Sequence, residues 1–169
     1  MSRDALVVGI NTYRSQGFPA LNSPALDAEA VAQRLAIAGE FRTIRRLPEM
    51  ITQTASRAPV VSKTAPVFLW QLEEALLRLF KPESIQAPET ALFYFSGHGM
   101  HDPHGYDKGF LVTSDTDPNN PRSGLSLNWL QWLLSESPIK QQIVWLDCCH
   151  SGALIVKVGA ANPGNSESR

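Results

Sequence analysis

Short apolar runs alternate with longer segments of helical period along the chain. The runs are rich in β-branched and aromatic residues and nearly continuous, which is typical of buried strands. They span residues 5–10, 92–95 and 143–146, with a shorter run at 110–113. Residues 43–47, which include two arginines, form a weaker strand pattern. Leucines that recur at helical spacing between residues 66 and 80 predict a helix with one face on a sheet. The alternation predicts an α/β fold with a mainly parallel sheet flanked by helices.

Capping and breaking residues mark where the other helices begin and end. Ser23 is expected to cap a helix that has Pro24 in its first turn and stops at Gly39. Ser126 is expected to cap an apolar helix that continues to Leu134. Residues 50–65 and 100–124 are crowded with turn-forming residues, so both are expected to be surface loops.

Composition narrows the class of protein and its partners. A chain of 169 residues with 43% hydrophobic and 18% charged residues is typical of a soluble globular domain. The net charge of −1 provides no basic field for nucleic acid or an anionic membrane. No run reaches the ~18 apolar residues that span a bilayer, and residues 1–4 lead into the first strand without the pattern of a signal peptide. We therefore expect a cytoplasmic protein with neither nucleic-acid nor membrane partners.

Reactive side chains follow two of the predicted strands. One strand runs into Ser96-Gly-His-Gly99, and another runs into Asp147-Cys-Cys-His-Ser-Gly152. In an open parallel sheet, ligands bind at the carboxyl ends of strands, so His98 and a cysteine can share one site. An imidazole can take the proton of a thiol that is otherwise only a few per cent ionised at neutral pH. Backbone N–H groups of Gly99 and of the nucleophile could then form an oxyanion hole.

Both motifs resemble those of caspase-like peptidases, most closely metacaspases, including the bacterial members called orthocaspases. The resemblance extends to Ala5-Leu-Val-Val-Gly-Ile-Asn-Thr-Tyr13 and to residues 21–31, and a histidine about 50 residues before the cysteine is usual in caspases. It implies a three-layer caspase-like (caspase-hemoglobinase) fold and a cysteine endopeptidase. The Gln-Ala-Cys-Arg-Gly motif of animal caspases is absent, so aspartate specificity is not implied. The alternative is a signalling or scaffold module without turnover, although such degenerate members normally lose the histidine or the cysteine.

The resemblance aligns Cys149 with the family's nucleophile and Cys148 with the variable position before it. Neighbouring residues at a strand end point to opposite sides, so only one thiol can readily face His98. The alternative is that both cysteines are small buried hydrophobes. A disulfide between adjacent cysteines would be strained, so we expect both to be reduced. His150 is expected to have a structural role.

An acidic substrate pocket is expected beside the nucleophile. Asp147 lies two residues before Cys149, and Ser96 lies two before His98, so each shares a side with its partner. A carboxylate in the pocket attracts an arginine or lysine side chain of a peptide substrate and repels aspartate. Resemblance to metacaspases adds Asp27 as a second acidic pocket residue. The other interpretation of Asp27 is a helix first-turn acid stabilised by the helix dipole.

No metal or other cofactor is expected. Many metacaspases use calcium, and Asp115 and Asp117 could contribute to such a site. Calcium requires six or more oxygen ligands, however, and aspartates in a loop rich in Pro and Asn are more often turn formers. A cluster of His98, His101, Asp102 and His104 is also conceivable, but it lacks the spacing of a zinc site.

The resemblance covers the large, p20-like subunit of the family and not its small C-terminal subunit. We expect a catalytic domain over residues 1–158 and a flexible linker over residues 159–169. Arg169 is expected to be the P1 residue of an autocatalytic cut in a zymogen. The expected partner is a p10-like C-terminal fragment that stays bound after the cut. The alternative is that the sequence simply ends there.

Overall fold

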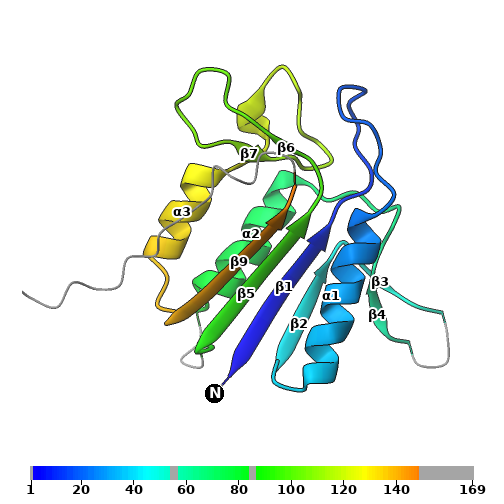
Figure 1. Cartoon of the computed structure of the whole chain (residues 1–169), viewed down its shortest axis with the longest axis vertical. Coiled ribbons are helices and arrows are strands. Elements are labelled where there is room, and N and C mark those ends of the chain that lie inside the picture. The colour runs from blue at the N-terminus through cyan, green and yellow to red at the C-terminus, as the bar shows by residue number, and fades with distance from the viewer. Residues whose placement is uncertain (1, 54–56, 84–86, 149–169) are drawn as a thin grey trace, which may run out of the picture.

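Figure 1 shows the computed structural model of the chain, which describes residues 2–53, 57–83 and 87–148. Four parallel strands form the central sheet in the order β2-β1-β5-β9. They are β1 (Arg3–Gly9), β2 (Thr43–Leu47), β5 (Thr90–Ser96) and β9 (Gln141–Asp147). Helix α1 (Pro24–Ala38) covers one face, and α2 (Leu69–Phe80) and α3 (Leu127–Ser135) cover the other. The three-layer α/β fold with a parallel sheet is therefore confirmed.

The predicted helix boundaries are largely confirmed, with one difference in how α1 is capped. Gly39 ends α1 with a φ of 71°, and the Ser126 hydroxyl accepts the N–H of Trp129 at the start of α3. Ser23 occupies the N-cap position of α1, but its side chain makes no capping hydrogen bond. The Asn11 side chain caps α1 instead, because its Oδ1 accepts the N–H of Ala25 at 2.9 Å.

Two segments expected to be loops contain short strands. Residues 50–65 overlap a hairpin of β3 (Glu49–Ile51) and β4 (Pro59–Val61), so the prediction of a loop there was wrong in part. The hairpin is held to α1, because Val61 is buried against it and the Glu29 carboxylate accepts the Val61 N–H at 2.9 Å. Beyond the main sheet, a small second sheet joins β6 (Gly99–Met100), β7 (Phe110–Leu111) and β8 (Leu125–Ser126), and a 3-10 helix spans Pro121–Ser123.

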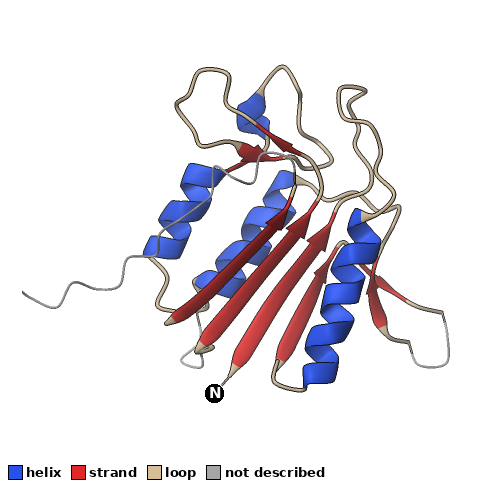
Figure 2. Cartoon of the chain, in the orientation of Figure 1, coloured by secondary structure: helices blue, strands red, loops and turns tan. Residues whose placement is uncertain are grey.

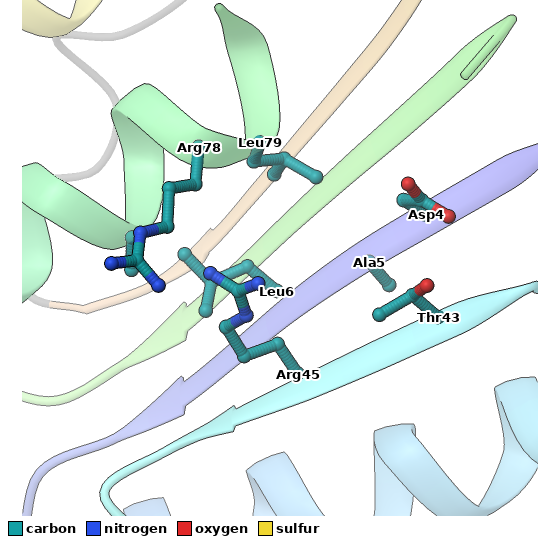
Figure 3. Close-up of a pocket in the computed structure, with 8 residues that line it drawn as sticks. Asp4, Ala5, Leu6, Thr43, Arg45, Arg78 and Leu79 are labelled. Atoms are coloured by element: carbon teal, nitrogen blue, oxygen red, sulfur yellow. The ribbon is translucent and has the colours of Figure 1, made fainter. Parts of the chain in front are cut away.

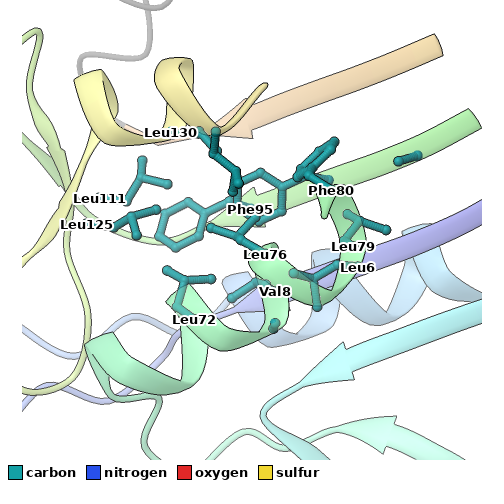
Figure 4. Packing of buried hydrophobic residues seen from close by; sticks show 14 of the residues in the cluster. Leu6, Val8, Leu72, Leu76, Leu79, Phe80, Phe95, Leu111, Leu125 and Leu130 are labelled. Atoms are coloured by element: carbon teal, nitrogen blue, oxygen red, sulfur yellow. The ribbon is translucent and has the colours of Figure 1, made fainter. Parts of the chain in front are cut away.

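The central strand β5 is buried on both faces along its whole length. Phe93 and Phe95 pack against the leucines of α2 and α3, as Figure 4 shows for Phe95, whereas Leu92 and Tyr94 pack on the side of α1. Burial of one large apolar side chain contributes about 1.5–3 kcal/mol. A shift of β5 by one residue would exchange these faces, so the core fixes where the strand ends.

The long loops gather at the carboxyl end of the sheet, beyond the arrowheads in Figure 2. Gly9 at the end of β1 allows the start of α1 to approach, because an added Cβ would lie 2.3 Å from the carbonyl oxygen of Pro24. Residues 97–109 leave β5 at this same end of the sheet. Within the described part of the chain, no helix has the length and apolar character needed to cross a bilayer.

Candidate active site

The register of β5 and β9 brings the two sequence motifs side by side. Ser96 pairs with Asp147 across these parallel neighbours. One residue further on, the N–H of Gly97 donates to the carbonyl of Asp147 at 3.4 Å. His98 and the cysteine motif therefore leave the sheet from adjacent strand ends.

The His98 ring is held by a backbone carbonyl and two aromatic rings. Its Nε2 lies 2.8 Å from the carbonyl oxygen of Pro19. A carbonyl oxygen can only accept a hydrogen bond, so this contact assigns the proton of the neutral imidazole to Nε2. Nδ1 is then the basic nitrogen. The ring centroids of Tyr13 and Phe18 lie 4.8 and 5.9 Å from that of His98.

The Tyr13 hydroxyl links the backbone of His98 to the end of β1 by two hydrogen bonds. It donates to the carbonyl of Ile10 at 2.9 Å and accepts the backbone N–H of His98 at 3.1 Å. Burial raises the pKa of Tyr13 to about 12, so the phenol stays neutral at physiological pH. Gly97 permits this contact, because an added Cβ would lie 3.0 Å from the Tyr13 hydroxyl.

Gly99 presents its backbone N–H away from the small sheet. The N–H of Val112 donates to the carbonyl of His98 at 3.0 Å, and Gly99 is paired with Leu111. In an antiparallel ladder this pattern makes Gly99 and Leu111 a non-hydrogen-bonded pair, whose N–H groups point outward. The Gly99 N–H therefore points away from β7.

An open pocket brings Asp27, Ser96 and Asp147 together at the carboxyl end of the sheet. Asp27 is half-buried in the first turn of α1, Ser96 is 4% exposed and Asp147 is exposed. No basic side chain is among the described residues that line the pocket: Leu21, Asn22, Ser23, Pro24, Asp27, Ser96, Gly97, Asp147 and Cys148. The two carboxylates therefore give the pocket a negative charge.

Cys148 lines the same pocket and is half-buried. It packs with Val144 and Leu146 against the hydrophobic cluster under α2 and α3. The remaining predicted site residues, Cys149, His150 and Arg169, lie outside the described residues. The described part of the pocket thus contains one of the two thiols.

The aspartates considered for calcium hold loops together. The Asp115 carboxylate accepts the N–H of Leu69 at 3.0 Å and the hydroxyl of Thr113 at 2.7 Å, and so caps α2. Asp117 accepts the N–H of Asn119 at 2.9 Å. Over residues 2–53, 57–83 and 87–148, no group of three His, Cys, Asp or Glu side chains is placed to hold a metal ion.

The acids of the 101–109 loop are likewise engaged in hydrogen bonds. The Asp102 carboxylate accepts the N–H groups of His104 and Asp107 at 3.0 and 2.8 Å. These donors, His104 first, lower the pKa of Asp102. The hydrogen bonds shape the loop that follows His98.

A second pocket lies at the opposite, amino end of β1 and contains none of the predicted site residues. Figure 3 shows Arg45 and Arg78 reaching into it from β2 and α2. Asp4, on its wall, accepts two hydrogen bonds from Arg42 at 2.7 and 3.1 Å, and Arg78 is paired with Glu74. Surface ion pairs of this kind contribute little to stability, because solvent screens their charges.

The fold and the site define a three-layer α/β protein whose parallel sheet has, at its carboxyl end, an acidic pocket that a thiol lines and a histidine that follows one of the strands. The family model described as the caspase domain matches residues 2–168, nearly the whole chain. The chain therefore belongs to the caspase-domain family, peptidase family C14, and is a cysteine peptidase of that family. The resemblance to caspase-like peptidases is confirmed. No match is found among curated proteins.

Two supporting residues of this site were missed in the sequence. Pro19 contributes only its carbonyl oxygen, which every residue carries, so no side-chain pattern marks it. Tyr13 lies inside the segment that resembles the family's first strand, and an aromatic residue just past a strand end was the available signal.

Proposed function

We propose that the protein is a cytoplasmic cysteine endopeptidase of the metacaspase or orthocaspase type that cleaves peptide bonds after arginine or lysine. The observation that carries the proposal is the β5–β9 register, which pairs Ser96 with Asp147. With this register β5 and β9 end side by side, and the pocket with Asp27, Ser96 and Asp147 lies at that end of the sheet. Both observations support a site that His98 would share with the cysteine motif.

In the proposed mechanism Cys149 is the nucleophile and His98 is the general base and acid. Because Pro19 holds Nε2–H, Nδ1 takes the thiol proton, and the Pro19 carbonyl stabilises the imidazolium that forms. The thiolate attacks the scissile carbonyl carbon, and the N–H groups of Gly99 and Cys149 stabilise the oxyanion. His98 then protonates the leaving amine. Water attacks the thioester, with His98 as base, and releases the new carboxyl end.

Asp27, Ser96 and Asp147 are proposed to bind the side chain of the P1 residue. A guanidinium or ammonium group is attracted by two carboxylates, whereas an aspartate side chain is repelled. Ser96 also lines the pocket, and its hydroxyl can accept a hydrogen bond.

A p10-like C-terminal fragment of the same precursor is the proposed partner. Within the described sheet, β9 is an edge strand, and Ile143 and Trp145 on it are 45% and 57% exposed. An apolar edge strand is a template for another strand. Such a partner would cover these side chains and extend the sheet.

Substrate preference tests the proposal directly. The full-length protein is incubated with fluorogenic peptides that differ only in P1, which is arginine, lysine or aspartate. We expect hydrolysis of the arginyl and lysyl peptides at rates at least about a hundredfold above that of the aspartyl peptide, and loss of activity after alkylation of thiols. Absence of hydrolysis with intact thiols would support the scaffold alternative.

Self-processing after Arg169 is the second proposed property, since an arginine in P1 fits the acidic pocket. A longer precursor that continues beyond Arg169 is purified as the wild type and as its Cys149→Ala variant, and the fragment termini are read by intact-mass spectrometry. We expect a fragment ending at Arg169 in the wild type alone. Equal cleavage of both proteins at this bond would assign the cut to another protease.

A further inference from the structure

Tyr94 lies directly behind the acidic pocket, at a buried position of β5. It pairs with Trp145 of β9, and the next position on this face pairs Ser96 with Asp147. Register partners in a parallel sheet point to the same side. Tyr94 and Trp145 therefore lie next to Ser96 and Asp147, the two residues of this face that line the pocket. Tyr94 is only 3% exposed, and its ring meets that of Trp145 edge-on at 5.4 Å and 89°.

The phenolic hydroxyl of Tyr94 reaches an acidic residue of the pocket. It donates to Oδ2 of Asp147 at 3.3 Å. Burial, and next the negative charge of Asp147, raise the pKa of Tyr94 to about 12, while a hydrogen bond with Ser96 acts in the opposite direction. The phenol is therefore protonated at every physiological pH and can always act as a donor to this carboxylate.

The hydrogen bond from Tyr94 restrains a side chain that is otherwise exposed, because Asp147 lies at the end of β9, an edge strand of the described sheet. An exposed aspartate can rotate about its side-chain bonds, and the plane of its carboxylate is then not fixed. With Oδ2 held by Tyr94, the plane of the carboxylate is restrained and Oδ1 is left for a ligand in the pocket.

We propose that Tyr94 is a positioning residue that orients Asp147 and thereby makes the pocket prefer arginine over lysine. The inference rests on the proposed function, because it concerns the same P1 pocket. A guanidinium is a planar fork that needs a carboxylate in a fixed plane, whereas an ammonium group is a point charge that accepts many orientations. Loss of the Tyr94 hydroxyl should therefore weaken binding of arginine more than binding of lysine.

The test compares Tyr94→Phe with the wild type on arginyl and lysyl peptides of otherwise identical sequence. Phenylalanine keeps the buried ring and removes only the hydroxyl. We expect the ratio of kcat/KM for arginine over lysine to fall roughly three- to tenfold, the range of one hydrogen bond. The change should appear in KM for the arginyl peptide, with kcat nearly unchanged.

Two controls separate orientation of Asp147 from a general structural effect. Tyr106→Phe removes a hydroxyl from a side chain that is 76% exposed, outside the pocket, and should leave the ratio unchanged. In an Asp147→Asn background, Tyr94→Phe should change the ratio much less than it does in the wild type, because the carboxylate it orients is gone. Melting temperatures of all variants report whether the fold is kept.

An unchanged ratio in Tyr94→Phe, or equal losses on both peptides through kcat, would overturn the positioning role while leaving the proposed function intact. Equal effects of Tyr94→Phe with and without the Asp147 carboxylate would also overturn it. A wild type that hydrolyses neither peptide would instead remove the proposed function, and this inference with it. The two failures are therefore distinguished by the wild-type activity alone.

Discussion

Replacement of Cys149 by alanine is expected to lower the hydrolysis of an arginyl peptide by at least about a thousandfold, because in the proposed mechanism its thiol forms the covalent thioester. Cys148→Ala is the matched control and should retain activity within about threefold. Cys148 packs against the hydrophobic cluster with Val144 and Leu146, on the opposite face of the strand from Asp147. The measurement is kcat/KM of each full-length variant.

Mass spectrometry provides an independent readout of the same assignment. A peptide chloromethyl ketone with arginine in P1 should alkylate Cys149 in the wild type and no cysteine in Cys149→Ala. Because Cys148 also lines the pocket, the reverse result has a clear meaning. Labelling of Cys148, together with loss of activity in Cys148→Ala, would identify Cys148 rather than Cys149 as the nucleophile.

The framework of the site was predictable because strands buried on both faces leave a continuous apolar pattern. β5 is such a strand, and its sequence from Ala91 to Phe95 consists of aliphatic and aromatic residues. A parallel sheet places its strand ends at one edge, so two motifs that follow strands were expected to meet there. In the structure, the two strand ends are neighbours, because Ser96 at the end of β5 pairs with Asp147 at the end of β9.

What could not be predicted depends on backbone groups and on weak local patterns. The Pro19 carbonyl contacts His98 across 79 positions of sequence, and a main-chain oxygen leaves no trace in a residue pattern. Asn11 caps α1 from 14 positions away, whereas local reasoning assigned the cap to Ser23. The β3–β4 hairpin was missed because each strand has only three residues, too few to establish a period of two.

The second large effect is expected from Asp147→Asn, which removes one negative charge from the pocket and keeps the size of the side chain. We expect kcat/KM for the arginyl peptide to fall about 30-fold, equivalent to roughly 2 kcal/mol. This is the lower end of the 2–5 kcal/mol typical of buried charge pairs, because Asp147 is exposed and solvent screens its charge. The loss should lie mainly in KM.

Specificity distinguishes a lost pocket charge from a damaged fold. The aspartyl peptide should gain, or at least not lose, rate in Asp147→Asn, because a carboxylate that repelled its side chain is gone. Glu83→Gln is the matched control, since it changes the net charge by the same amount at a residue outside those that line the pocket. If Asp147→Asn and Glu83→Gln leave kcat/KM for the arginyl peptide equally unaffected, Asp147 does not bind the P1 side chain. Asp27→Asn then becomes the decisive variant, because Asp27 is the other carboxylate of the pocket.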